Sequence, residues 1–174
     1  MIVFALDAAA VRTGWAVLSF EEGSPTLVDY GAMELPKTMK IGERLALFRS
    51  TLLDLINEYE PDRVSVEEPY IRFFKTSMVL VKVAGIVDHL AYETTGKEAL
   101  VIHPSTVRSQ LGVKTKGDVA KADVAKKVVA RFGIQETEFD ETDAIAVGWV
   151  TPAIIRRKEC QKPKRKRKKK APKD

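Results

Sequence analysis

The chain has 174 residues, 45% of them hydrophobic and 30% charged, and a formal net charge of +5. This length suits one domain with a full core, and the composition is typical of a soluble globular protein. No apolar run approaches the roughly 20 residues of a membrane span, and the early Asp7 argues against a signal peptide. The single cysteine excludes a disulfide framework, so we expect a cytoplasmic protein of a bacterium or an infected host.

The charge is divided unevenly along the chain. Residues 156–174 hold 12 of the 29 Lys and Arg residues but only 2 of the 24 Asp and Glu residues, so this segment carries +10 and the rest of the chain −5. Because the segment has almost no apolar content, we expect it to be a disordered basic tail that binds phosphates without sequence specificity. A merely solubilising tail is the alternative. The folded domain is then predicted to span residues 1–155.

Apolar runs and periodicity predict the elements of that domain. Strands are expected at residues 1–7, 13–20, 26–35, 63–67 and 99–103. Helices are expected at residues 41–59, 76–94, 105–110, 118–132 and 139–155, with Ser105 and Asp118 as N-caps of the third and fourth. Three strands followed by alternating helices and strands predict an α/β fold. Its sheet would be mixed and five-stranded, a three-strand antiparallel meander plus two parallel strands, with helices on both faces.

Acidic residues stand at the ends of these elements. Asp7 and Glu67 each follow an apolar strand, and parallel neighbours would place both at one edge of the sheet. Asp140 and Asp143 lie three apart at a helix start, where they would share one face. Taken singly, Asp-X-X-Asp at a helix start is more often ordinary capping and a Glu-Glu pair before proline a surface feature, whereas an Asp after an apolar strand is more informative. Together, four converging carboxylates need a cation, and oxygen ligands favour Mg²⁺, with Mn²⁺ as a substitute. Two such ions would activate a water and stabilise the leaving oxygen of a phosphodiester.

These motifs, in this order, carry a resemblance to a known family. The apolar strand ending in Asp7, then Arg12-Thr13-Gly14, then Val64-Ser65-Val66-Glu67, then Asp140-X-X-Asp143-Ala144 resemble the RuvC-type Holliday-junction resolvases of the RNase H-like superfamily. The resemblance covers nearly all of residues 1–155 and implies an RNase H-like fold. Ala8-Ala9 departs from the family's Pro-Gly, and the basic end is closer to phage or viral members.

The resemblance also implies roles for single residues. Asp7, Glu67, Asp140 and Asp143 would be the catalytic metal ligands, and Glu67 fits the motif better than Glu68. Lys121 would be a catalytic cation near the scissile phosphate, although most lysines on a helix are simply solvated. Further DNA contacts are expected from Tyr70, Arg72, Phe73, Lys75, Arg108, Lys114 and Lys116.

Four residues of this set, two aromatic and two basic, lie in the short stretch 70–75. Tyr70 and Phe73 could stack on unpaired bases while Arg72 and Lys75 hold phosphates. Packing of Phe73 and Phe74 under the following helix is the alternative, and we expect it for at least one of them. His103 is expected to have no chemical role.

The sequence therefore predicts a Mg²⁺-dependent crossover junction endodeoxyribonuclease that leaves a 5′-phosphate and a 3′-hydroxyl. The substrate would be a Holliday junction or other branched DNA, and its two symmetric cleavage points predict a homodimer built on the helix at 76–94. Two alternatives remain open. One is an RNase H-like nuclease that processes structured RNA, and the other is a non-catalytic protein that binds branched DNA.

Overall fold

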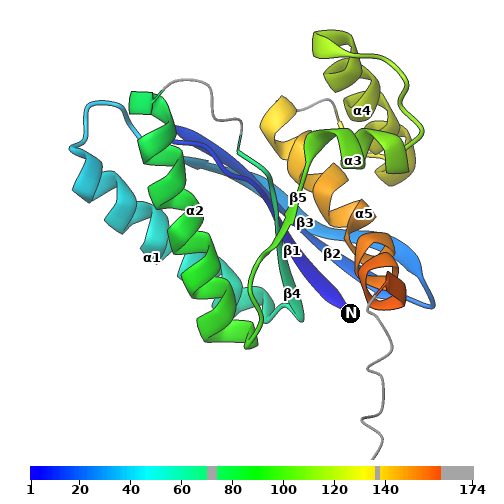
Figure 1. The fold of residues 1–174 in the computed structure, drawn as a ribbon, viewed down its shortest axis with the longest axis horizontal. Helices are drawn as coiled ribbons and strands as arrows, with labels where there is room; N and C mark the ends of the chain where they lie inside the picture. Colours follow the sequence, from blue (N-terminus) through cyan, green and yellow to red (C-terminus); the bar gives the residue numbers. More distant parts are fainter. Residues whose placement is uncertain (70–73, 136–137, 162–174) are drawn as a thin grey trace, which may run out of the picture.

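The computed structural model describes residues 1–69, 74–135 and 138–161, with the backbone alone for 74–77 and 161, and these residues form five strands and five helices (Figure 1). The strands are β1 (Ile2–Asp7), β2 (Arg12–Glu21), β3 (Ser24–Glu34), β4 (Arg63–Glu67) and β5 (Leu100–Ile102). The helices are α1 (Ile41–Tyr59), α2 (Phe74–Thr95), α3 (Pro104–Gln110), α4 (Gly117–Phe132) and α5 (Phe139–Gln161).

The strands form one mixed sheet in the order β3-β2-β1-β4-β5. The pairs β1/β2 and β2/β3 are antiparallel, whereas β1/β4 and β4/β5 are parallel. The predicted meander with two added parallel strands is confirmed. Because β1 and β4 run in the same direction with Leu6 opposite Val66, the next residue of each strand, Asp7 and Glu67, emerges at the same edge of the sheet.

Helices cover both faces of this sheet, as predicted. Figure 1 shows α1 and α2 on one face and α3, α4 and α5 on the other. Phe4 and Leu6 of β1 pack toward α1 and α2, and Ala5 between them packs toward α5. A strand buried on both sides needs apolar residues at consecutive positions, which explains the unbroken run at the start of the chain. Within the described ranges, no helix is long and apolar enough to cross a membrane.

Small residues allow α5 to approach the sheet closely. A Cβ built on Gly148 would lie 2.3 Å from Cδ1 of Leu18 and 3.1 Å from Cβ of Ala5. A Cβ on Gly14 of β2 would lie 2.0 Å from the backbone oxygen of Asp140. Gly14 is also the antiparallel partner of Asp7. Glycine at this point of β2 therefore lets the first turn of α5 lie directly beside the end of β1.

Three helix ends differ from the predictions. The N-cap of α3 is His103, whose Nδ1 accepts a hydrogen bond of 3.1 Å from the backbone N–H of Ser105, and Pro104 begins the helix because its missing N–H is not needed there. The N-cap of α4 is Lys116, and Asp118 lies in the first turn. The helix α5 continues to Gln161, past the expected start of the disordered tail at 156.

Candidate metal centre

Three of the predicted carboxylates meet at one edge of the sheet. Asp7 comes from the end of β1, Glu67 from the end of β4 and Asp143 from the second turn of α5. One carboxylate oxygen from each residue lies within 4.8 Å of the other two. We call Asp7, Glu67 and Asp143 the three-carboxylate cluster. Parallel pairing of β1 and β4 and the close approach of α5 at Gly14 bring these residues together from distant parts of the chain.

The electrostatics of the cluster disfavour three negative charges without a cation. Burial, followed by the charges of Asp143 and Asp140, raises the pKa of Asp7 to about 7, against a lowering effect of Lys121. Burial, followed by the charges of Asp7 and Asp143, raises the pKa of Glu67 to about 8. Burial also raises the pKa of Asp143. A divalent cation among these oxygens would lower the pKa of each carboxylate, because it favours the ionised form of every ligand.

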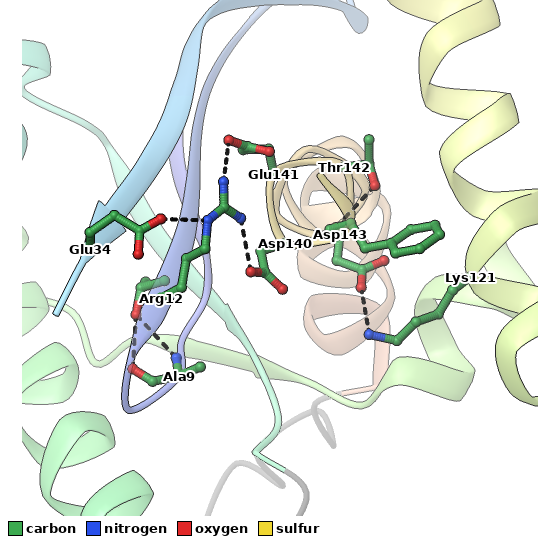
Figure 2. Close-up of polar contacts among 10 residues, drawn as sticks. Ala9, Arg12, Glu34, Lys121, Asp140, Glu141, Thr142 and Asp143 are labelled. Carbon is green, nitrogen blue, oxygen red and sulfur yellow. Dashed lines mark hydrogen bonds and ion pairs between the residues drawn. The ribbon is translucent and has the colours of Figure 1, made fainter. Parts of the chain in front are cut away.

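Lys121 of α4 supplies part of the missing positive charge. Its Nζ lies 3.2 Å from Oδ2 of Asp143 (Figure 2). Burial lowers the pKa of Lys121, but the carboxylates of Asp143, Asp7 and Glu67 together more than offset this, and the net shift is upward. Oδ2 of Asp143 is buried, and the ion pair does not give it a well-directed hydrogen bond. This oxygen and the all-carboxylate donor set fit a hard divalent ion such as Mg²⁺ or Mn²⁺.

We expect the stability of the metal-free protein to fall as the pH rises from 5.5 to 9. The folded protein holds protons on Asp7 and Glu67 that the unfolded chain releases near pH 4, so these groups stabilise the fold at low pH and lose that effect as the pH passes 7 and 8. Each pKa unit is worth about 1.4 kcal/mol. With about 2–4 °C per kcal/mol for a domain of this size, Tm should drop by several degrees.

Thermal melts across this pH range, with and without Mg²⁺ or Mn²⁺, test that expectation. The metal should raise Tm most at the alkaline end, where the carboxylates are ionised. The variant Asp7→Asn should show a weaker pH dependence than the native protein. A metal-free Tm that stays constant or rises with pH would contradict the electrostatic description of the cluster.

The fourth predicted carboxylate, Asp140, takes a different position. Its Oδ2 accepts a hydrogen bond of 2.9 Å from Nη1 of Arg12, as Figure 2 shows. The same guanidinium donates from Nη2 to Glu141 and from Nε to Glu34, both at 2.8 Å. The carboxylate of Asp140 is not one of the three within 4.8 Å of one another, although its charge acts on Asp7 and Asp143. We call Arg12 with its three acidic partners the Arg12 fork.

The turn after Asp7, where Ala8-Ala9 replaces Pro-Gly, is held by a side chain. The hydroxyl of Thr13 donates to the carbonyl oxygen of Ala9 at 3.0 Å and accepts from the N–H of Ala9 at 3.1 Å. Thr13 is fully buried. This reciprocal pair closes the turn without proline, so the position of Asp7 does not depend on the Pro-Gly sequence.

The cluster lies in a cleft of about 810 Å³. Besides the three carboxylates, its lining includes the predicted cations Arg108 and Lys121, together with Glu68 and Leu80. His103, for which no chemical role is expected from its sequence context, also lines the cleft. His103 is the residue after Ile102, and Ile102 of β5 lies opposite Glu67 of β4. The pairing of these two parallel strands therefore brings His103 to the same edge of the sheet as Glu67.

The remaining predicted DNA contacts divide into two groups. Lys114 and Lys116 are exposed in the loop before α4. Tyr70, Arg72 and Phe73 lie outside the described residues, and so does the side chain of Lys75. Sequence reasoning missed the contact of Arg12 with α5. Its contact with Glu34 could have been found from a hairpin register that places these two residues opposite one another.

The fold and the carboxylate cluster together define a class, the RNase H-like proteins with an acidic metal site. A family profile described as "Crossover junction endodeoxyribonuclease RuvC" matches residues 3–151. The chain belongs to the RuvC family of crossover junction endodeoxyribonucleases. Its relatives include RuvC of Synechocystis sp., 29% identical over 82% of this chain and 85% of the relative, and RuvC of Alkaliphilus oremlandii, 30% identical over 84% and 90%.

Solved structures support the same fold. T. thermophilus RuvC in complex with a Holliday junction substrate superposes with a TM-score of 0.77 at 21% identity. The superposition covers 90% of this chain and 96% of the other. The predicted RNase H-like fold and the predicted family are thereby confirmed.

Proposed function

We propose that the chain is a Mg²⁺-dependent endonuclease that resolves Holliday junctions and leaves a 5′-phosphate and a 3′-hydroxyl. The observation that carries the proposal is the convergence of Asp7, Glu67 and Asp143 within 4.8 Å in a cleft that also contains cationic side chains. Family membership supports the same reaction, and T. thermophilus RuvC was solved with a Holliday junction. The site of action would be the cytoplasm.

The metal would be held by the three-carboxylate cluster, with Asp140 as a further ligand. Bound ions would supply a nucleophilic water near neutral pH and neutralise charge on the leaving oxygen. The chain's own residues then have distinct tasks. Lys121 neutralises Asp143 before the metal binds and afterwards lies beside the cleft as a cation for a phosphate oxygen. Arg108, on α3, lines the same cleft and would orient the phosphodiester.

Binding of DNA must overcome the net negative charge of the folded body. Lys114 and Lys116 provide exposed cations on the α4 side of the cleft. The α5 helix begins at the metal site and ends at Gln161, 18 residues beyond Asp143 (161 − 143), which is about 27 Å at 1.5 Å per residue. The basic residues that follow would therefore contact the arms of a junction rather than its cleavage point.

The substrate's two-fold symmetry calls for two copies of the chain, and α2 offers a surface for their contact. Met78, Val81 and Tyr92 expose 43%, 49% and 63% of their surface. Their spacing, with Gly85 between them, places them on one side of the helix, and a Cβ on Gly85 would meet nothing within 4 Å. We propose that this stripe forms a C2 interface, because large apolar side chains in one stripe mark contact sites.

A charge placed in this stripe is expected to separate the dimer. In Val81→Glu, a C2 interface would bring two carboxylates together in an apolar contact, and light scattering should report a monomer at micromolar concentration. The monomer should still nick one strand of a junction but lose paired cleavage. An exposed residue on α1, Asp54→Lys, provides the control. A Val81→Glu protein that stays dimeric would contradict the interface.

The function itself is tested on labelled substrates. A four-way DNA junction, a linear duplex and a structured RNA are incubated with the full chain, with and without Mg²⁺. The proposal expects paired cuts in the junction alone, and only with the metal. Cleavage of the RNA in preference would support an RNA-processing nuclease. Junction binding that is indifferent to Mg²⁺, with no cut product, would support a binding protein without catalysis.

A further inference from the structure

The Arg12 fork connects the sheet to the metal site. Glu34 of β3 and Glu141 of α5 hold two nitrogens of the guanidinium, each at 2.8 Å, and the third nitrogen reaches Asp140 at 2.9 Å. Figure 2 shows the guanidinium lying between Glu34 on one side and the first turn of α5 on the other. The plane of the guanidinium is thus fixed by contacts from two elements. With two nitrogens held in this way, the third nitrogen, Nη1, points toward Asp140.

Asp140 is held beside the cluster rather than inside it. Arg12 contacts Oδ2 alone of the two Asp140 oxygens. The side chain of Asp140 is 35% exposed, so without Arg12 it has room to rotate toward solvent. The negative charges of the cluster would favour that rotation, because like charges within a few ångströms repel. Arg12 opposes it and holds the carboxylate of Asp140 where its charge acts on Asp7 and Asp143.

We propose that Arg12 is a positioning residue for Asp140, which it holds where this carboxylate can serve as a fourth metal ligand. The inference rests on the proposed metal-dependent function and deepens it. Carboxylates that bind metals are commonly oriented by a second hydrogen bond, and losing that bond typically costs about 10–100-fold in metal affinity. A lysine at position 12 would keep the charge, but its single nitrogen could not replace three nitrogens that reach three separate carboxylates from one plane.

The competing description is that Arg12 only neutralises surplus negative charge at the start of α5. The two descriptions differ for Arg12→Lys. A positioning role predicts weaker metal binding in this variant, although its charge is intact. A purely electrostatic role predicts no change for Arg12→Lys, and tighter metal binding for Arg12→Gln because a nearby cation is removed.

The test measures Mn²⁺ binding to the full chain without DNA, from the electron paramagnetic resonance signal of free Mn²⁺. The proteins are the native chain, Arg12→Lys, Arg12→Gln, Asp140→Asn and the double variant Arg12→Lys/Asp140→Asn. We expect Arg12→Lys to weaken Mn²⁺ binding about 10-fold or more. Asp140→Asn should weaken it at least as much, and the double variant should be no weaker than Asp140→Asn alone. Such full non-additivity is the signature of one residue acting through another.

Two further variants keep the result interpretable. Arg49→Lys alters an exposed ion pair with Glu93 between α1 and α2 and should bind Mn²⁺ like the native chain. Glu34→Gln leaves Arg12 and Asp140 in place but removes the charge of the anchor on the sheet, while its amide oxygen can still accept from Nε, so it should weaken Mn²⁺ binding in the same direction by a smaller factor. It also tests the proposal if Arg12→Lys does not fold, which its metal-free Tm will show.

Additive losses in the double variant, or unchanged Mn²⁺ binding in both Arg12→Lys and Glu34→Gln, would overturn the positioning role. Neither result would affect the proposed function, whose test is junction cleavage by the native chain. Failure of the native chain to bind Mn²⁺ would overturn the metal site itself.

Discussion

Asp7→Asn is expected to abolish junction cleavage while leaving junction binding intact. The substitution removes a charge from the centre of the three-carboxylate cluster, where Asp7 lies close to both Glu67 and Asp143. Losing a residue that only orients a ligand costs about 10–100-fold, so losing a ligand should cost at least about 100-fold in cleavage rate. Single-turnover cleavage of a labelled junction in Mg²⁺ measures the loss, and gel-shift titration in Ca²⁺ measures binding.

The same variant should be more thermally stable than the native chain at pH 8 without metal. Asp7 is partly buried and its pKa is raised to about 7, so at pH 8 it is ionised in the folded protein and this charge destabilises the fold, which the amide avoids. Activity and stability are therefore expected to change in opposite directions, which a general folding defect cannot produce. Asp54→Asn, an exposed acid on α1, is the matched control. Cleavage retained by Asp7→Asn would contradict the assignment of the site.

Gly14→Ala is expected to disrupt the site without altering any polar group. The new Cβ would lie 2.0 Å from the backbone oxygen of Asp140 and 2.3 Å from its carbonyl carbon, so β2 or the start of α5 must move. Overpacking of this kind costs about 1–3 kcal/mol or more. At about 2–4 °C per kcal/mol, Tm should fall by several degrees. Because α5 carries Asp143, we also expect a large loss of Mn²⁺ binding and cleavage.

Gly42→Ala is the matched control for that experiment. Gly42 lies in the first turn of α1, where an added Cβ would meet nothing within 4 Å, and alanine is the better helix former. Its Tm should stay equal or rise by a degree or two, with cleavage unchanged. A Gly14→Ala protein with native Tm and native activity would show that α5 does not need this close approach.

The order and type of the elements could be read from the sequence because they depend on local patterns. The helix at 41–59 and the strand at 63–67 have the predicted bounds. Apolar spacing and the turn residues between segments decide such elements over a few residues. Helix ends were less predictable. His103, and not Ser105, is the N-cap of α3 because its ring nitrogen accepts a hydrogen bond from the backbone N–H of Ser105 in the first turn.

The site was predictable only in part. Asp7 and Glu67 follow buried strands, and the sequence alone indicated that parallel strands would bring such residues to one edge of the sheet. Spacing alone also placed Asp140 and Asp143 on one face of a helix. It could not separate their environments, because the hydrogen bond from Arg12 to Asp140 spans 128 residues of chain.

The sequence by itself therefore determined the elements, the family resemblance and the set of carboxylates. Only the tertiary structure decided that Asp143 is paired with Lys121, that Asp140 is held by Arg12, and that Gly14 admits the start of α5. The physical reason is how far apart along the chain the interacting residues lie. Periodicity and capping act between neighbours along the chain, whereas the ion pairs and close contacts of the site join β2, α4 and α5, which become neighbours only when the sheet and its helices have assembled.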